Sequence, residues 1–298
     1  MNAHSRGKNG GALNQALPGA PSVNGPLASA AIIELVSQTA SVTVTRHVAN
    51  AVTETDDAVV IEEPLEIRVG ERPVSVTMRT PGHDFELAAG FLFTESIVQR
   101  AEDIESIRHW GSANVVRVAL KEGVKVDLQR LQRHFYSTSS CGVCGKTSID
   151  AVRVNTSAID DDIRVTGETI ARLPELLRGA QTTFDATGGI HAAGLFDPDG
   201  TLLRVREDLG RHNAVDKVIG SALLDGTPLE RRILFVSSRT SFELVQKAAV
   251  ARIPFLAAVG APSSLAVELA RELNMTLLGF VREGRFNIYS GAERVTLR

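Results

Sequence analysis

Cysteine is scarce in this chain, whose 298 residues include two, Cys141 and Cys144. A single pair of cysteines this close in sequence cannot form a structural disulfide framework. A chain of this length buries roughly 75% of the surface of its unfolded state, so its core needs no disulfide for stability. The low cysteine content excludes a disulfide-stabilised scaffold, and we expect both thiols to be reduced.

Long apolar runs and an excess of one charge are also missing. The 32 Lys and Arg residues nearly balance the 35 Asp and Glu residues, and the net charge is -3. That balance excludes a chain that binds nucleic acid or anionic membranes through its overall charge. No segment approaches the ~18 consecutive apolar residues of a membrane-spanning helix, and the N-terminus lacks the apolar stretch of a signal peptide. These absences predict a cytoplasmic protein with no nucleic-acid or membrane partner.

Composition and periodicity divide the chain into four predicted segments. Residues 1–35 are rich in Gly, Pro, Ser and Asn, which predicts a disordered polar tail. Residues 36–135 contain short apolar strands, a helix that Asp84 can cap and that runs through about Ile97, and a short helix over residues 128–135, which predicts a small, β-rich α+β domain. Residues 136–148 are small and polar, and we predict a mobile loop that carries both cysteines. Residues 149–298 alternate apolar strands with helices, which predicts an α/β domain with a mostly parallel sheet.

The Cys141-Gly-Val-Cys144 pair is the first candidate for chemistry. A free thiol is mostly protonated at neutral pH, and a nearby Lys or a helix N-terminus favours the reactive thiolate. Lys146 and a predicted short helix follow the pair. Four interpretations stay open: a zinc half-site completed by His191 and His212, a thioredoxin-type redox site, an inert pair, and a thiolate that accepts and passes on sulfane sulfur. We favour the last, because the serine-rich loop suits an exposed, reactive thiol.

Two strand-to-helix junctions are candidates for phosphate binding. The segment Ser238-Arg239-Thr240 follows a predicted strand over residues 233–236, and Gly260-Ala-Pro-Ser-Ser264 repeats this arrangement one unit later. Ligands of open α/β sheets lie at the carboxyl ends of strands, where helix N-termini offer free N–H groups. A guanidinium binds phosphate in a bidentate manner. Helix capping would also explain the hydroxyls, but two consecutive junctions favour a phosphorylated ligand.

Three more segments combine glycine with polar side chains. The first, Phe280-Val281-Arg282-Glu283-Gly284-Arg285, has two guanidinium groups around a predicted turn. In the second, Gly188-Gly189 precedes His191, and paired glycines let the backbone approach a ligand closely. An ordinary turn would explain the first segment equally well, and it explains the second better than a ligand site does. The third, residues 206–213, is a dense polar run, which by itself is typical of a solvated face.

Five motifs follow one another along the chain. They are Cys141-Gly-Val-Cys144-Gly145, Phe184-Asp-Ala-Thr-Gly-Gly-Ile-His191, Arg206-Glu-Asp-Leu-Gly-Arg-His-Asn213-Ala-Val-Asp-Lys217, Ser237-Ser-Arg-Thr-Ser241 and Gly279-Phe-Val-Arg-Glu-Gly-Arg285. In this order they resemble the FdhD family of accessory sulfurtransferases, which formate dehydrogenase requires for activity. The resemblance covers residues 41–298, and the long polar tail departs from the simplest family members.

The resemblance implies a cytoplasmic homodimer that receives persulfide sulfur from a cysteine desulfurase. It implies transfer of this sulfur to the molybdenum or tungsten of the bis(molybdopterin guanine dinucleotide) cofactor, before the cofactor enters apo-formate dehydrogenase. Cys141 corresponds to the persulfide carrier and Cys144 to an assisting thiol. The cofactor-binding stretch corresponds to residues 280–285, and GDP is expected to mimic the cofactor. The junction and glycine patterns add the remaining expected cofactor contacts, which are Ser238, Arg239, Thr240, Gly189 and His191.

The implied fold is a three-layer C-terminal domain similar to cytidine deaminase, beside the smaller N-terminal domain. Deamination is not implied, because His191-Ala192-Ala193 lacks the catalytic Glu and no downstream PCxxC motif exists to hold zinc. We expect no tightly bound structural metal. The alternatives are a non-catalytic chaperone that binds the molybdenum cofactor and a CxxC thiol–disulfide oxidoreductase.

Overall fold

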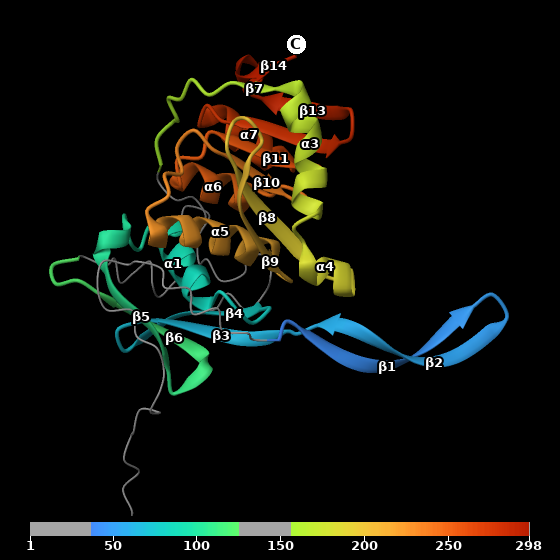
Figure 1. The fold of residues 1–298 in the computed structure, drawn as a ribbon. Coiled ribbons are helices and arrows are strands. Elements are labelled where there is room, and N and C mark those ends of the chain that lie inside the picture. Colours follow the sequence, from blue (N-terminus) through green and yellow to red (C-terminus); the bar gives the residue numbers. More distant parts are fainter. Residues whose placement is uncertain (1–36, 125–155, 298) are drawn as a thin grey trace, which may run out of the picture.

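The computed structural model describes residues 37–124 and 156–297, which form two packed parts (Figure 1). Both cysteines, the predicted helix over residues 128–135, the predicted loop over residues 136–148 and the predicted tail over residues 1–35 lie outside the described residues. The predicted boundaries between the four segments therefore stay predictions. Within the two described ranges, no helix combines the length and the apolar character needed to cross a membrane.

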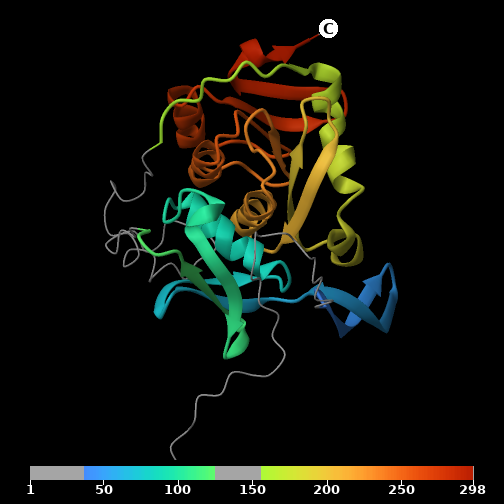
Figure 2. The same cartoon turned by 60° about the vertical axis from the view of Figure 1, so that its left-hand side comes forward.

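A two-stranded ribbon leads into the N-terminal part. β1 (Thr39–Val48) and β2 (Ala51–Val60) pair antiparallel along their whole length and project from the body (Figures 1 and 2). Val and Thr recur along both strands, and these residues favour β structure. The base of the ribbon is anchored at α4 (Thr182–Thr187), where the Thr183 hydroxyl donates to the Gln38 side chain at 2.6 Å.

A four-stranded sheet and one helix make up the rest of the N-terminal part. The strand order is β4-β3-β6-β5, from β3 (Glu63–Val69), β4 (Arg72–Arg79), β5 (Ile104–Trp110) and β6 (Ser112–Leu120). α1 (Asp84–Thr94) packs on one face, so the helix predicted in this region is confirmed. It ends at Thr94 and not near Ile97, and the Asp84 carboxylate accepts from the Arg79 guanidinium instead of capping the helix. The pattern does not predict β5, because its apolar residues recur at every third position and its register shifts near both ends.

A six-stranded sheet between two helical layers forms the C-terminal part (Figures 1 and 2). The strand order is β13-β12-β11-β10-β8-β9, from β8 (His191–Phe196), β9 (Leu202–Asp208), β10 (Ile233–Val236), β11 (Phe255–Ala258), β12 (Thr276–Arg282) and β13 (Arg285–Ser290). α3 (Gly167–Arg178) covers one face and leads into α4, while α5 (Arg211–Asp225), α6 (Phe242–Val250) and α7 (Ser264–Glu272) cover the other. A small parallel pair, β7 (Val165–Thr166) and β14 (Val295–Thr296), lies beside α3.

Alternation along the central strands explains the two layers. Phe235 packs toward α3, whereas Leu234 and Val236 pack toward α5, α6 and α7. All four residues of β10 are buried because helices cover both faces of the sheet. A strand covered on both faces is a continuous apolar run in sequence, and the strand predicted over residues 233–236 is confirmed.

The sheet is mixed, which corrects the prediction of a mostly parallel sheet. β10, β11 and β12 pair in parallel and are joined by α6 and α7. β8 pairs antiparallel with β9 and β12 pairs antiparallel with β13, because tight turns over residues 197–201 and 283–284 join these strands. β8 also pairs antiparallel with β10. Short turns connect only antiparallel neighbours, whereas parallel strands need a crossover. The α/β class holds. The sequence also predicts a helix over residues 167–181 that Pro174 kinks or divides, and in the structure this helix divides after Arg178 instead.

The two parts meet where α1 crosses α5. A Cβ atom on Gly90 would lie 1.9 Å from the Asp216 carbonyl oxygen, and one on Gly220 would lie 1.9 Å from the Glu86 carbonyl oxygen. The two helix backbones are therefore in direct contact, and only glycine leaves room for this approach. The crossing holds α5 against the N-terminal part, and the first turn of α5 borders the candidate site.

Candidate functional site

The two strand-to-helix junctions noted in the sequence lie side by side at one edge of the sheet. The Thr240 N–H donates to the Ala261 carbonyl at 3.1 Å, and the Ser263 N–H donates to the Thr240 carbonyl at 3.0 Å. A Cβ atom on Gly260 would lie 2.8 Å from the backbone nitrogen of Arg239, so this contact requires glycine. The loops meet because β10 and β11 are parallel neighbours whose carboxyl ends share one edge.

Only one of the three residues predicted in the first junction has an exposed side chain. Ser238 and Thr240 are buried, and the Ser238 hydroxyl donates to the Arg239 carbonyl at 3.0 Å. Ser238 and the backbone of Thr240 shape the paired loops. Arg239 is exposed, and its guanidinium is the group of this junction that suits an anionic ligand.

The predicted segment over residues 280–285 joins the same edge. The Phe280 N–H donates to the Gly260 carbonyl at 3.1 Å, which attaches the β12–β13 hairpin to the second junction. A register shift lies between Gly279 and Arg282. Val281 is buried, whereas Phe280 is 40% exposed in a left-handed backbone conformation. The remaining four residues of the segment are exposed: Arg282, Glu283, Gly284 and Arg285.

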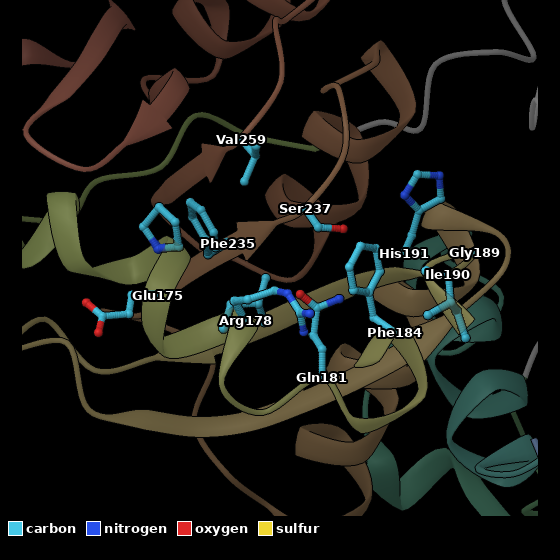
Figure 3. A pocket seen from close by; sticks show the side chains of 13 residues that line it. Glu175, Arg178, Gln181, Phe184, Gly189, Ile190, His191, Phe235, Ser237 and Val259 are labelled. Atoms are coloured by element: carbon cyan, nitrogen blue, oxygen red, sulfur yellow. The ribbon is translucent and has the colours of Figure 1, made fainter. Parts of the chain in front are cut away.

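The third predicted element, Gly189 and His191, lines a cavity next to this edge. β8 pairs antiparallel with β10, and the Ala192 N–H donates to the Ser237 hydroxyl at 2.9 Å. A cavity of about 610 Å³ opens there between α3, α4, the glycine turn and the ends of β10 and β11 (Figure 3). Its lining residues are Pro174, Glu175, Leu177, Arg178, Gln181, Phe184, Gly188, Gly189, Ile190, His191, Phe235, Ser237 and Val259.

The wall of the cavity combines aromatic, cationic and amide groups. The Arg178 guanidinium stacks over the Phe184 ring at 4.5 Å from its centroid, and Asp185 pairs with Arg178 at 2.5 Å. Gln181 lines the same cavity (Figure 3). The sequence analysis singled out the motif around Phe184 but not Arg178 and Gln181. Polar residues near the end of a predicted helix are common on protein surfaces, so their type and position did not predict a place in a cavity wall.

The surroundings of His191 favour the neutral form of its imidazole. Burial lowers the pKa of His191, and the nearby positive charge of Arg211 lowers it further, while Asp208 opposes the shift. A neutral imidazole offers one donor and one acceptor. His191 therefore contributes hydrogen-bonding capacity to the cavity and no positive charge.

A second histidine is held at the start of α6. His212 Nε2 lies 3.2 Å from the Ser241 hydroxyl and 3.8 Å from the Glu243 carboxylate. Although burial opposes it, hydrogen bonds from His212 and Ser241 lower the pKa of Glu243 to about 2. His212 thus links the first turn of α5 to the first turn of α6 next to the cavity.

The polar run before and within α5 is buried, which corrects its interpretation as a solvated face. Lys217 Nζ lies 2.8 Å from Asp208 Oδ2 and donates to the Thr80 carbonyl at 2.8 Å. Asp208 also accepts from the Gly210 N–H at 2.8 Å and from the Asn213 amide at 3.0 Å. This network fixes the start of α5 relative to the N-terminal part.

Glu207 in the same run positions the aromatic wall of the cavity. Its carboxylate accepts from the backbone N–H groups of Thr183 and Phe184, each at 2.9 Å. These are the first N–H groups of α4, which have no partner inside the helix. Glu207 caps α4 from β9, and this cap holds Phe184 in the cavity wall.

Metal ligation was one alternative for the cysteine pair. Among residues 37–124 and 156–297, no group of three His, Cys, Asp or Glu side chains could hold a metal ion. The thiols that a zinc half-site would need lie outside these ranges, so the structure does not bear on that alternative.

Comparison with known proteins identifies close relatives. The model of the FdhD/NarQ family matches residues 60–296. The chain is 52% identical over 260 residues to the sulfur carrier protein FdhD of Streptomyces coelicolor, an alignment that covers 83% of this chain and 92% of that protein. It is 50% identical over 266 residues to the protein of the same name from Mycobacterium tuberculosis, with 84% and 96% covered.

A solved structure has the same fold. The crystal structure of a putative formate dehydrogenase accessory protein from Desulfotalea psychrophila superposes with a TM-score of 0.70 at 25% sequence identity. The superposition covers 87% of this chain and 100% of that one. The α/β architecture described above is therefore shared with a formate dehydrogenase accessory protein.

Proposed function

Because the chain belongs to the FdhD/NarQ family, we propose that it is a sulfurtransferase that carries persulfide sulfur for the maturation of formate dehydrogenase. The sulfur donor is a cysteine desulfurase, and the acceptor is the metal of bis(molybdopterin guanine dinucleotide). The loaded cofactor then passes to apo-formate dehydrogenase. We propose that the protein works in the cytoplasm as a homodimer.

The first step is the loading of Cys141. Its thiolate attacks the terminal sulfur of the donor's cysteine persulfide, the sulfur–sulfur bond of the donor breaks, and the donor cysteine leaves as a thiolate. Cys141 then carries the persulfide. No net oxidation occurs, because one persulfide is exchanged for another.

The second step needs two electrons, since sulfane sulfur must leave at the level of sulfide. The Cys144 thiolate supplies them when it attacks the Cys141 sulfur. A Cys141–Cys144 disulfide forms, and the outer sulfur departs as hydrosulfide toward the metal of the bound substrate. The Cys-Gly-Val-Cys spacing suits this internal attack.

The observation that carries the proposal is the family match, and the geometry at the edge of the sheet supports it. Two loops, a hairpin and a cavity from segments up to about 100 positions apart meet there. The exposed guanidinium groups of Arg239, Arg282 and Arg285 suit the diphosphates of a dinucleotide. The cavity beside them suits a planar ring.

The decisive test is the mass of the purified chain after incubation with a cysteine desulfurase and cysteine, before and after reductant. We expect one added sulfur that the reductant removes, located on the peptide that contains Cys141. Cys141→Ala should lose it and also fail to support formate dehydrogenase maturation. Cys144→Ala serves as the matched control and should still load sulfur, because loading uses only Cys141.

The opposite result is equally informative. If an active desulfurase leaves no sulfur on the wild-type chain, the carrier function is wrong and a cofactor-binding chaperone becomes the better proposal. Efficient reduction of insulin by the protein would instead favour a thiol–disulfide oxidoreductase.

A further inference from the structure

The four-stranded sheet of the N-terminal part has one face that no described helix covers. Alternate residues of its strands, such as Leu65, Ile67 and Val116, pack in the core under α1, which lies between the sheet and α5 (Figure 1). Among residues 37–124 and 156–297, no helix packs on the opposite side of the sheet. We call this side the open face, and its composition shows whether it is suited to solvent or to a partner.

Three arginines form a row across the open face. Arg68 of β3 pairs in register with Arg117 of β6, and Arg117 pairs in register with Arg108 of β5. Residues that pair across neighbouring strands lie on the same face, so the three side chains are direct neighbours. Like charges placed opposite each other destabilise a sheet, and such a row therefore needs compensating negative charge.

Carboxylates within the chain compensate two of the three arginines. Arg117 lies 2.6 Å from the Glu71 carboxylate, and Arg68 lies 3.6 Å from the Glu66 carboxylate. Arg108 is exposed and forms no ion pair with any residue that the structure describes. One positive charge of the row is thus left for a group outside the chain.

Trp110 holds this uncompensated charge in position. The Arg108 guanidinium lies 5.1 Å from the centroid of the Trp110 ring, and the Arg117 guanidinium lies 4.6 Å from it. Cations are attracted to the face of an indole ring. Both guanidinium groups are therefore held against one aromatic ring at the surface, where a partner would lose little side-chain entropy on binding them.

Apolar side chains continue the open face beside the row. Val76 and Met78 of β4 are 43% and 40% exposed. Val76 pairs with Glu66, which in turn pairs with the half-buried Val115 of β6. The solvated face of a sheet is usually polar, whereas apolar groups beside charged ones mark interaction sites. Trp, Arg and Met are also the residues that protein interfaces favour.

This combination fits a protein partner. Carboxylates on the partner would complement the arginine row, and apolar side chains would cover Val76 and Met78. A nucleic-acid backbone would supply negative charge but nothing to cover the apolar half, and the net charge of -3 on the chain opposes polyanion binding. The open face therefore suits a protein surface on which acidic and apolar side chains lie together.

We propose that the open face is the docking surface for the sulfur donor, with Arg108 and Trp110 at its centre. β6 carries Arg117 and ends at Leu120, and Cys141 lies in the next segment of the chain. The thiol that receives sulfur is thus connected directly to this sheet, and the donor must reach that thiol. This inference rests on the proposed function, in which the donor is a cysteine desulfurase.

Trp110 gives a direct test, because it is the only tryptophan of the chain. The full chain is labelled with fluorotryptophan and titrated with unlabelled desulfurase in the absence of cysteine, while fluorine NMR follows its single resonance. We expect the resonance to shift or broaden in a saturable manner, with an affinity that falls as salt rises. An unchanged resonance at concentrations where calorimetry detects binding would show that the desulfurase docks elsewhere, and would overturn the inference. A shift caused by a short oligothymidine would overturn the assignment to a protein partner.

Charge reversal at Arg108 gives a second readout. Arg108→Glu should weaken desulfurase binding about tenfold or more, because a like charge then faces the acidic surface of the donor. The desulfurase concentration for half-maximal sulfur loading should rise by a similar factor, while loading at saturating desulfurase stays at the wild-type rate. Arg172→Glu is the matched control, because Arg172 is exposed on α3 and should bind as the wild type does. Both variants should melt at the wild-type temperature, since both changes are at the surface.

The outcomes separate this inference from the proposed function. If Arg108→Glu binds the desulfurase as the wild type does while the wild type loads sulfur, the inference fails and the proposed function stands. If the wild type binds the desulfurase at the open face but loads no sulfur, the docking surface stands and the carrier function fails. If Arg108→Glu instead loses binding of apo-formate dehydrogenase and keeps that of the desulfurase, the open face serves the acceptor enzyme and the inference is wrong.

Discussion

Three arginines at the edge of the sheet are exposed although the surrounding loops are tightly packed. Arg239 lies between two buried residues of the first junction, and Arg282 and Arg285 flank the turn of the β12–β13 hairpin. A guanidinium group keeps its charge at every physiological pH and binds phosphate through two parallel hydrogen bonds. These side chains are well placed to bind a phosphorylated ligand without any change in the packed core.

Replacing any of these arginines by alanine should weaken GDP binding about tenfold, because each variant loses a charge-assisted hydrogen bond. Titration calorimetry at low and moderate salt measures the effect, and the wild-type affinity should fall as salt rises. Arg72→Ala is the control, since Arg72 is exposed on β4 of the N-terminal sheet. Wild-type GDP affinity in Arg239→Ala, Arg282→Ala and Arg285→Ala alike would contradict phosphate binding at this edge.

At the scale of elements, the crossing of α1 and α5 determines where the site forms. The two helices touch backbone to backbone through Gly90 and Gly220. α5 begins at Arg211, and its first turn contains His212. The contact at Gly220 lies more than two turns further along this helix and holds the first turn in place. The close packing of α1 on α5 thus fixes the position of the C-terminal part relative to the N-terminal part.

Gly220→Ala should destabilise the protein by about 3 kcal/mol or more, because the added methyl would lie 1.9 Å from the Glu86 carbonyl oxygen and the backbones must separate. Urea denaturation measures the loss. The matched control is Gly179→Ala, where the new methyl meets its nearest atom at 3.5 Å and the backbone is right-handed helical. The control should be neutral or more stable by about 0.5 kcal/mol. Equal stability of the two variants would refute the tight crossing.

Across the whole molecule, ion pairs and the hydrogen bonds that they make join the two parts. Lys217 and Asp208 bind Thr80, and Lys247 lies 2.8 Å from Asp216 and 2.9 Å from the Thr94 hydroxyl. The third pair joins Arg206 of β9 to Glu86 of α1 through two hydrogen bonds of 2.5 and 2.8 Å. Breaking one partner of such a pair leaves an uncompensated charge, so these pairs specify one arrangement of the two parts.

Glu86→Gln should remove about 3 kcal/mol of stability at neutral pH. Although burial opposes it, the hydrogen bond and charge of Arg206 lower the pKa of Glu86 from 4.5 to about 2, and a shift of this size corresponds to about 3 kcal/mol. Because the folded-state pKa lies below the unfolded one, the contribution is complete above about pH 4.5. It is lost as the pH falls toward about 2.

Urea denaturation at several pH values checks this dependence. The difference in unfolding free energy between wild type and Glu86→Gln should be constant from pH 8 to 6 and shrink below about pH 4.5. Glu105→Gln, a change at an exposed residue of β5, should cost less than about 0.5 kcal/mol throughout. A difference as large at pH 3 as at pH 7 would disprove the assignment to Glu86.

Local chemistry made several features predictable from the sequence. The strand over residues 233–236 and the helix from Asp84 follow from apolar runs, periodicity and turn residues, which act over a few positions. The two junctions after β10 and β11 were predicted at the carboxyl ends of consecutive strands, and the structure brings them together at one edge, because strand–helix–strand units repeat the same geometry. The motifs also sufficed to identify the family, because they occur in a fixed order.

Only the tertiary structure decided which polar residues are buried and which of them form a cavity. Lys217 finds Thr80 at a distance of 137 positions, so no local pattern separates this buried run from a solvated face. The cavity is assembled from α3, α4, β8 and β10, and Glu207 of β9, distant in sequence, caps α4 where the Gln181 side chain makes no cap. The sequence by itself determined the elements, the family and the residue types available for chemistry. Burial and pairing depend on contacts between distant segments, and those exist only in the folded chain.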